Sequence, residues 1–426
     1  MNAPVKTPEE RQAELQGMGD SRLRKEDARF IQGKGQYCDD IKLPGMLHMD
    51  IVRSPIAHGR IKNIKKDDAL AIPGVHAVLT ADDLKPLNLH WMPTLAGDVA
   101  AVLADEKVHF QMQEVAIVIA DDRYIAADAV EAVEVEYEEL PVVMDPYAAL
   151  EADAPVLRED LAGKNEGAHG PREHHNHIFT WEAGDKSAAD DVFASAPVTV
   201  SQHMLYPRVH PCPLETCGCV ASFDPIKGEL TTWMTSQAPH VVRTVVSMLS
   251  GVPESKVRII SPDIGGGFGN KVGVYPGYVC AIVSSIVLGK PVKWSEDRIE
   301  NISSTAFARD YHMDGHLAAT EDGKILGLKV DVVADHGAFD ACADPTKFPA
   351  GLFHICSGSY DISAAHCSVK GVYTNKAPGG VAYRCSFRVT EAVYLIERMV
   401  DVLAQKLDID KAEIRRKNLI RKDQFP

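Results

Sequence analysis

The residues best suited to chemistry lie in one short stretch, Gly379-Gly380-Val381-Ala382-Tyr383-Arg384-Cys385-Ser386-Phe387-Arg388. Cys385 stands between two arginines, after paired glycines and before a long amphipathic segment. Cationic neighbours and the N-terminus of a helix both stabilise a thiolate relative to a thiol. The stretch therefore makes Cys385 the leading candidate for a metal-binding or reactive sulfur. The alternative is an unreactive buried cysteine, because free cysteines commonly pack as small apolar residues.

Two further stretches could contact an anionic ligand. Gln237 follows an expected strand over residues 229–234, and its amide can donate a hydrogen bond to an oxygen without adding charge. A second strand, beginning near Val257, runs into Gly265-Gly266-Gly267-Phe268-Gly269-Asn270-Lys271. Glycines let backbone N–H groups approach a phosphate or a metal-bound oxygen closely. The loop is neither a P-loop nor a dinucleotide fingerprint, since Asn270 stands where a third glycine would be needed.

Two clusters of potential metal ligands have simpler interpretations. Cys212, Cys217 and Cys219 do not follow a common zinc or iron–sulfur spacing, and no second cysteine cluster completes a ligand shell, so buried packing is the favoured interpretation. The histidines at 169, 174, 175 and 177 lack a cysteine or carboxylate at ligand spacing, which favours a solvated linker. The isolated His58 is expected to pack or to form hydrogen bonds rather than to bind a metal.

Composition restricts the class of protein. The chain has 426 residues, of which 45% are hydrophobic and 25% charged, as in ordinary globular proteins, and a net charge of −15. The negative charge and the lack of a basic patch argue against nucleic acid as a partner. The most apolar run, residues 275–288, is shorter than the roughly 20 residues that cross a bilayer. Nine scattered cysteines fit reduced thiols, and we expect a cytoplasmic protein that is not transmembrane.

The length predicts more than one domain, and the patterns suggest where they lie. We expect a flexible arm over residues 1–20, a compact domain of mixed helices and strands over 21–156, a linker over 157–186, and a second mixed domain over 187–426. A buried strand is expected at 115–120, a further strand at 292–295, a buried helix at 275–288, and a hairpin at Asp322-Gly323. The fold class predicted from these elements is α+β.

The heptad Ala382-Tyr383-Arg384-Cys385-Ser386-Phe387-Arg388 resembles the active-site loop of large subunits in the xanthine dehydrogenase/aldehyde oxidase family. The resemblance is to its aerobic molybdenum–copper branch, whose members oxidise carbon monoxide. Members that hydroxylate other substrates usually carry glycine or another small residue at the Cys385 position. The similarity extends from Arg22 to Phe425, and family large subunits are close to twice this length. It implies a hammerhead-like α/β domain followed by a molybdopterin-binding domain.

The resemblance also implies roles for individual residues. Cys385 would hold copper(I), and Gln237 would bond to an oxygen on molybdenum. Phe387 would shape an apolar pocket. The cofactor implied is molybdopterin cytosine dinucleotide with molybdenum, and its contacts would come from Gln237, Arg384 and the backbone of the glycine-rich loop, namely Gly267, Phe268 and Gly269. The active-site glutamate would belong to the half of the family chain that lies beyond this sequence.

The implied reaction is oxidation of carbon monoxide with water to carbon dioxide. The implied partners are an iron–sulfur small subunit and a FAD-binding medium subunit in a dimer of heterotrimers, in the cytoplasm or at the inner face of the cytoplasmic membrane. Two other hypotheses stay open. One is a molybdenum hydroxylase of aldehydes or N-heterocycles, in which Cys385 is incidental. The other is a non-catalytic, truncated scaffold that binds partner subunits.

Overall fold

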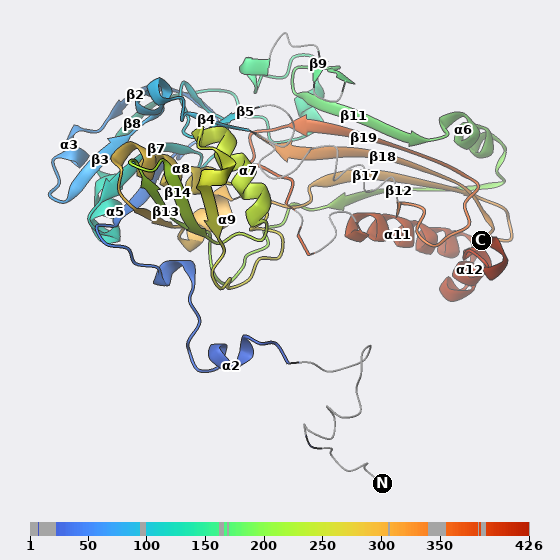
Figure 1. Cartoon of the computed structure of the whole chain (residues 1–426). Coiled ribbons are helices and arrows are strands. Elements are labelled where there is room, and N and C mark those ends of the chain that lie inside the picture. The colour runs from blue at the N-terminus through green and yellow to red at the C-terminus, as the bar shows by residue number, and fades with distance from the viewer. Residues whose placement is uncertain are drawn as a thin grey trace.

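The chain folds into two lobes, each built on a β-sheet with helices packed against it (Figure 1). The computed structural model describes residues 7, 23–93, 99–161, 166–167, 170–305, 307–339, 355–381, 383–384 and 389–425. The predicted α+β class is confirmed. No helix in these ranges is both long enough and apolar enough to span a lipid bilayer.

The first lobe contains a seven-stranded mixed sheet in the order β15-β14-β13-β16-β1-β7-β3. Its strands are β1 (Leu47–Arg53), β3 (Val75–Leu79), β7 (Glu114–Ala120), β13 (Gly218–Asp224), β14 (Glu229–Met234), β15 (Val257–Ile260) and β16 (Val292–Ser295). Strands β1 and β16 pair in parallel, with Leu47 opposite Val292. Residues from both expected domains therefore form one continuous sheet and share one hydrophobic core.

Local sequence explains the central elements of this sheet. Every residue of β7 is buried, as expected for an apolar run of strand length. Helix α8 (Pro276–Leu288) is apolar on all sides and packs against β13 and β16. Pro276 begins the helix, where a missing N–H costs nothing, and Gly289 ends it in the left-handed conformation. Helices α5 (Arg123–Glu131) and α7 (Pro239–Ser250) pack against β1 and β15, respectively.

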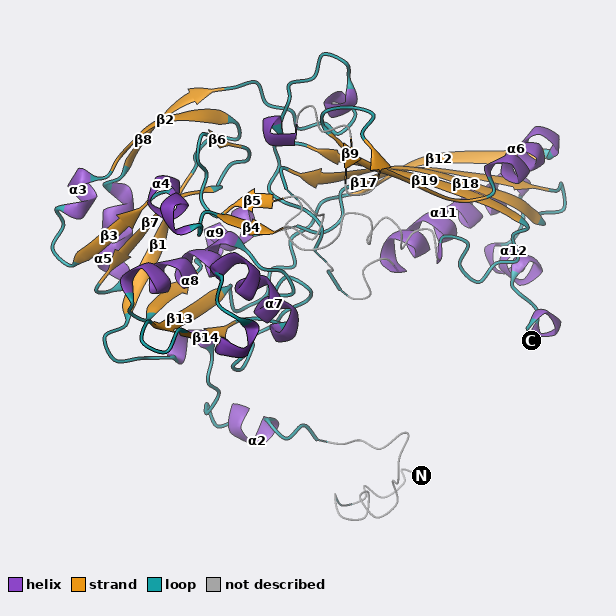
Figure 2. Cartoon of the chain, turned by 45° about the horizontal axis from the view of Figure 1, so that its top comes forward, coloured by secondary structure: helices purple, strands orange, loops and turns teal. Residues whose placement is uncertain are grey.

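The second lobe contains a five-stranded sheet in the order β11-β19-β18-β17-β12. Its strands are β11 (His177–Gly184), β12 (Val198–Tyr206), β17 (Tyr311–Ala319), β18 (Ile325–Gly337) and β19 (Ala364–Tyr373). The amphipathic helix α11 (Val389–Leu407) lies along β12 and β17 (Figure 2), and α6 (Lys186–Ser195) packs against β18 and β19. The predicted hairpin is confirmed, with Gly323 in the left-handed conformation that its turn requires.

Smaller elements complete the two lobes. Three short sheets are formed by β2 (Gly59–Lys65), β6 (Lys107–Val108) and β8 (Glu134–Glu139), by β4 (Trp91–Pro93) and β5 (Val99–Ala101), and by β9 (Glu166–Gly167) and β10 (Gly170–Pro171). The remaining α-helices of the described residues are α2 (Asp27–Phe30), α3 (Asp67–Leu70), α4 (Ala81–Leu84), α9 (Arg298–Ser304) and α12 (Lys411–Asn418).

The prediction of a linker over residues 157–186 is wrong for residues 177–184. Residues 177–184 form β11, which pairs with β19, and Asn176 and His177 are fully buried. The Asn176 amide accepts from the Leu157 N–H and donates to the carbonyls of Ala149 and Pro155. Composition is a poor guide here because a polar side chain can be buried once its hydrogen bonds are satisfied. The predicted role of His58 is confirmed, since its buried ring hydrogen-bonds the Pro141 carbonyl at 2.6 Å.

Candidate functional site

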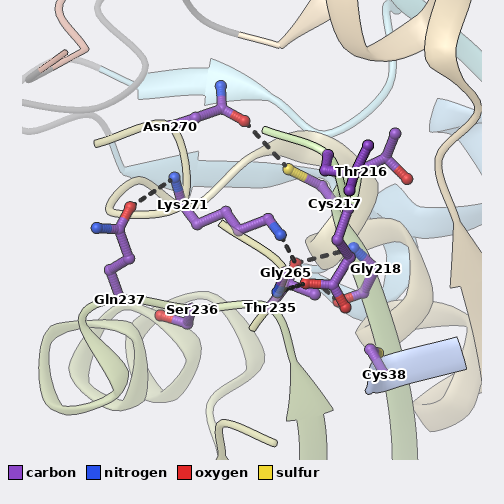
Figure 3. A network of polar contacts seen from close by, with 12 residues as sticks. Cys38, Thr216, Cys217, Gly218, Thr235, Ser236, Gln237, Gly265, Asn270 and Lys271 are labelled. Atoms are coloured by element: carbon purple, nitrogen blue, oxygen red, sulfur yellow. Dashed lines mark hydrogen bonds and ion pairs between the residues drawn. The ribbon is translucent and has the colours of Figure 1, made fainter. Parts of the chain in front are cut away.

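Gln237 is held by the backbone of the glycine-rich loop. It lies in the turn between β14 and α7, and its N–H donates to the Lys271 carbonyl at 2.7 Å. Its side-chain oxygen accepts from the Gly269 N–H at 3.1 Å and from the Lys271 N–H at 3.2 Å, the second of which is drawn in Figure 3. Because both donors fix the amide oxygen, the side-chain NH2 is the group left to bond a ligand. Gln237 is exposed, so a ligand can reach it.

The glycine-rich loop folds tightly around this side chain. A Cβ on Gly267 would lie 2.4 Å from the Gln237 side-chain carbonyl carbon, so only glycine fits against it. Gly266 and Phe268 both have positive φ, and the Phe268 side chain is half exposed. Within the described ranges the N–H groups of Gly266, Gly267 and Phe268 donate to no acceptor. The loop therefore offers several free donors beside the Gln237 NH2.

A buried ion pair fixes the base of the loop. The fully buried Lys271 ammonium contacts a Glu215 carboxylate oxygen at 2.7 Å. The same oxygen accepts from the Gly265 N–H at 2.7 Å, and the Glu215 N–H donates to the Gly265 carbonyl at 3.0 Å. Glu215 thus joins both ends of the loop. Sequence reasoning missed this role; the only signal was a lysine at the start of a long apolar stretch, which requires a countercharge once buried.

The cysteine-bearing stretch meets the glycine-rich loop at Arg384. The Arg384 N–H donates to the Phe268 carbonyl at 3.2 Å, and the Arg384 side chain is exposed. The structure therefore brings three of the predicted site elements together, namely Gln237, the glycine-rich loop and Arg384. Cys385 and Phe387, the other two predicted site residues, lie outside the described residues.

The predicted burial of Cys212, Cys217 and Cys219 holds for two of these three cysteines. Cys217 and Cys219 are buried, and burial raises the pKa of both thiols well above the usual value, so their packing role is confirmed. Cys212 is exposed, with the Arg298 guanidinium 3.6 Å from its sulfur, so the expected burial is wrong there. Its backbone is in the left-handed conformation, which is uncommon for residues other than glycine. The described part of the chain contains no group of His, Cys, Asp or Glu that could hold a metal, and its seven cysteines are free.

The assembled groups fit an anionic, oxygen-rich ligand. The Gln237 NH2, the loop N–H groups and the Arg384 guanidinium are all hydrogen-bond donors, and a carboxylate or phosphate oxygen is their natural partner. Phe268 adds an exposed apolar face. Backbone donors in a glycine-rich loop commonly cradle phosphates, so the set suits a pyrophosphate-bearing cofactor better than a bare metal ion.

Comparison with known proteins gives the class. A family model described as the molybdopterin cofactor-binding domain matches residues 169–419, and one described as the aldehyde oxidase and xanthine dehydrogenase a/b hammerhead domain matches residues 32–141. The chain therefore belongs to the molybdopterin-binding family of the aldehyde oxidases and xanthine dehydrogenases. The family and the domain types expected from the sequence are confirmed.

Individual relatives are more specific. The chain is 86% identical to the carbon monoxide dehydrogenase large chain of Hydrogenophaga pseudoflava, over 100% of this chain and 53% of that protein. It is 67% identical to the carbon monoxide dehydrogenase large chain of Afipia carboxidovorans, over 99% and 52%. The reconstituted CO dehydrogenase from Oligotropha carboxidovorans superposes with a TM-score of 0.95 at 67% identity, over 99% of this chain and 52% of that one. The chain spans about half the length of the curated relatives it matches.

Proposed function

We propose that this chain is the first cofactor-binding portion of a molybdenum–copper carbon monoxide dehydrogenase large subunit. The observation that carries the proposal is the Arg384–Phe268 contact. It joins the stretch bearing Cys385 to the loop that surrounds Gln237. The 86% identity to a carbon monoxide dehydrogenase large chain supports the same conclusion. The domain limits proposed are 21–156 and 187–426, joined by a shared sheet.

The chain's own residues would bind and orient the reacting groups. Bound molybdopterin cytosine dinucleotide with molybdenum, together with copper(I), would supply the two-electron oxidation of carbon monoxide with water to carbon dioxide. Gln237 would donate its NH2 to an oxygen of the cofactor, in an orientation already fixed by two backbone N–H groups. Gly267, Phe268 and Gly269 would approach the cofactor through the backbone, and Arg384 would neutralise its anionic part.

Cys385 and Phe387 complete the proposed site. A thiolate is a soft ligand and selects copper(I), so Cys385 would hold that ion. Phe387 would exclude water from a narrow pocket that admits a small apolar substrate. Electrons would pass to an iron–sulfur subunit and a FAD-binding subunit of the assembled enzyme, in a dimer of heterotrimers.

Metal analysis of the purified complex tests this function. We expect near-equal copper and molybdenum, and loss of copper and of carbon monoxide oxidation in Cys385→Ser with molybdenum retained. Molybdenum without copper, with turnover of an aldehyde or N-heterocycle, would favour a hydroxylase such as the quinoline 2-oxidoreductase that this chain resembles at 34% identity. A complex that held neither metal would favour a scaffold. Full activity in Cys385→Ser would exclude the copper role.

A further inference from the structure

Arg309 joins two residues that lie on either side of Cys385 in the sequence. It lies two residues before the start of β17, and its side chain is only 4% exposed. One guanidinium nitrogen donates to a Glu391 carboxylate oxygen at 2.5 Å, and the other donates to the Tyr383 carbonyl at 2.7 Å. Tyr383 is the second residue before Cys385, and Glu391 lies in the first turn of α11. A single side chain thus connects a residue before Cys385 to a residue after it.

The surroundings of Arg309 are built to hold this geometry. The guanidinium lies 5.3 Å from the centre of the Tyr206 ring and 5.7 Å from that of Tyr383. Arg309 and Asp310 both have left-handed backbone conformations, with φ of 71° and 73°. Such conformations are costly for residues other than glycine and persist only where the surrounding structure imposes them. The strained turn therefore serves to aim the Arg309 side chain.

Arginine is suited to this task where lysine is not. Its planar fork presents two nitrogens in fixed directions, so one residue can bond a carboxylate and a carbonyl together. Glu391 is itself 2% exposed, and its second oxygen accepts from the Thr390 hydroxyl at 2.9 Å. Both charges are removed from water, so the pair resists movement of either partner.

We propose that Arg309 is a positioning residue that fixes the distance between Tyr383 and Glu391. In doing so it sets where the Cys385 stretch meets the cofactor loop at Phe268. The expected effect on copper content rests on the proposed function, whereas the expected effect on the position of the stretch does not. Arg309 acts through the backbone it holds and touches no reacting atom.

The test uses the assembled complex with Arg309→Lys. Lysine keeps the charge and loses the fork. The matched control is Arg53→Lys, because Arg53 is equally buried between Glu114 at 2.9 Å and Glu300 at 2.7 Å and, among the residues that the structure describes, bonds none in the stretch. The readout is the rate of Cys385 alkylation by iodoacetamide after chelation of copper, measured by peptide mass spectrometry. Alkylation of the buried Cys219 reports unfolding.

We expect Arg309→Lys to raise the Cys385 alkylation rate by roughly tenfold, the effect of losing one charge-assisted hydrogen bond. The copper-to-molybdenum ratio should fall, and Arg53→Lys should change neither quantity. An unchanged rate in folded Arg309→Lys would overturn the proposal. If that variant unfolds, Glu391→Gln keeps the guanidinium and its carbonyl acceptor, and an unchanged rate there would overturn the proposal equally. The wild-type complex could hold no copper while Arg309→Lys still raised the Cys385 alkylation rate. That result would refute the proposed function and leave the positioning role standing.

Discussion

Removing the Glu215 carboxylate should release the glycine-rich loop. Glu215→Leu leaves the fully buried Lys271 ammonium without a countercharge and the Gly265 N–H without its acceptor. Breaking a buried pair by removing one partner costs about 3–5 kcal/mol. Glu215 is 19% exposed, so water can partly replace it, and we take the lower end, about 3 kcal/mol.

The assay is hydrogen exchange of the loop amides in the assembled complex. Gly269 and Lys271 are the reporters, because their N–H groups keep Gln237 as acceptor in every variant. If the loop opens locally, about 3 kcal/mol corresponds to exchange that is faster by roughly 100-fold. Exchange in the α8 peptide should not change, because that helix is buried independently.

A double variant separates the effect of the unpaired Lys271 charge from that of the unpaired Gly265 N–H. Glu215→Leu with Lys271→Met removes both charges, so the remaining loss is the unpaired Gly265 N–H, about 1–3 kcal/mol. The double variant should therefore exchange more slowly than Glu215→Leu alone. Equal or faster exchange in the double variant would refute the argument, as would a change of less than about fivefold in the single variant.

Three further outcomes follow from the geometry. Gln237→Glu keeps the acceptor oxygen and loses the donor, so molybdenum retention by the complex should fall about tenfold or more while the loop amides stay protected; normal retention would contradict the donor role. Gly267→Ala puts a methyl 2.4 Å from the Gln237 side-chain carbonyl carbon and should reproduce the molybdenum content of Gln237→Ala. Burial and the Glu300 charge raise the pKa of Asp50 to about 6, so the folded state binds the extra proton and stability falls as pH rises from about 4 to 6. Asp50→Asn should therefore raise the thermal midpoint by about 2–4 °C at pH 7.5, and by little at pH 4; a shift of equal size at both pH values would contradict the assignment.

Local patterns predicted much of the fold. The apolar run at 115–120 and the apolar segment at 275–288 become β7 and α8, because a continuous apolar stretch must be buried whatever surrounds it. The turn after residues 229–234 was by itself a weak signal for Gln237, which the resemblance to the family singled out. The glycine spacing excluded a P-loop, whereas the expected cofactor contact came from the resemblance to the family.

The linker and Cys212 show where composition misleads. Residues 177–184 were placed in a linker because the surrounding segment is rich in Gly, Asp, Glu and His, yet they form a strand that pairs with β19, nearly two hundred positions away. Cys212 was expected to be buried like its neighbours, but it is exposed. The strand pairing depends on residues far along the chain, and Cys212 has a backbone conformation that is rare for residues other than glycine.

The sequence by itself indicated which residues could do chemistry at this site, because an amide and a run of glycines offer hydrogen-bond donors and a cysteine between arginines offers a sulfur beside positive charge. Only the tertiary structure decided how they are held. Glu215 and Lys271 are 56 positions apart, and Arg309 reaches Glu391 across 82. Such pairs form only when the sheets bring distant segments together, and burial then makes each charge depend on its partner. The spacing of residues along the sequence does not show which charged residues will form these pairs.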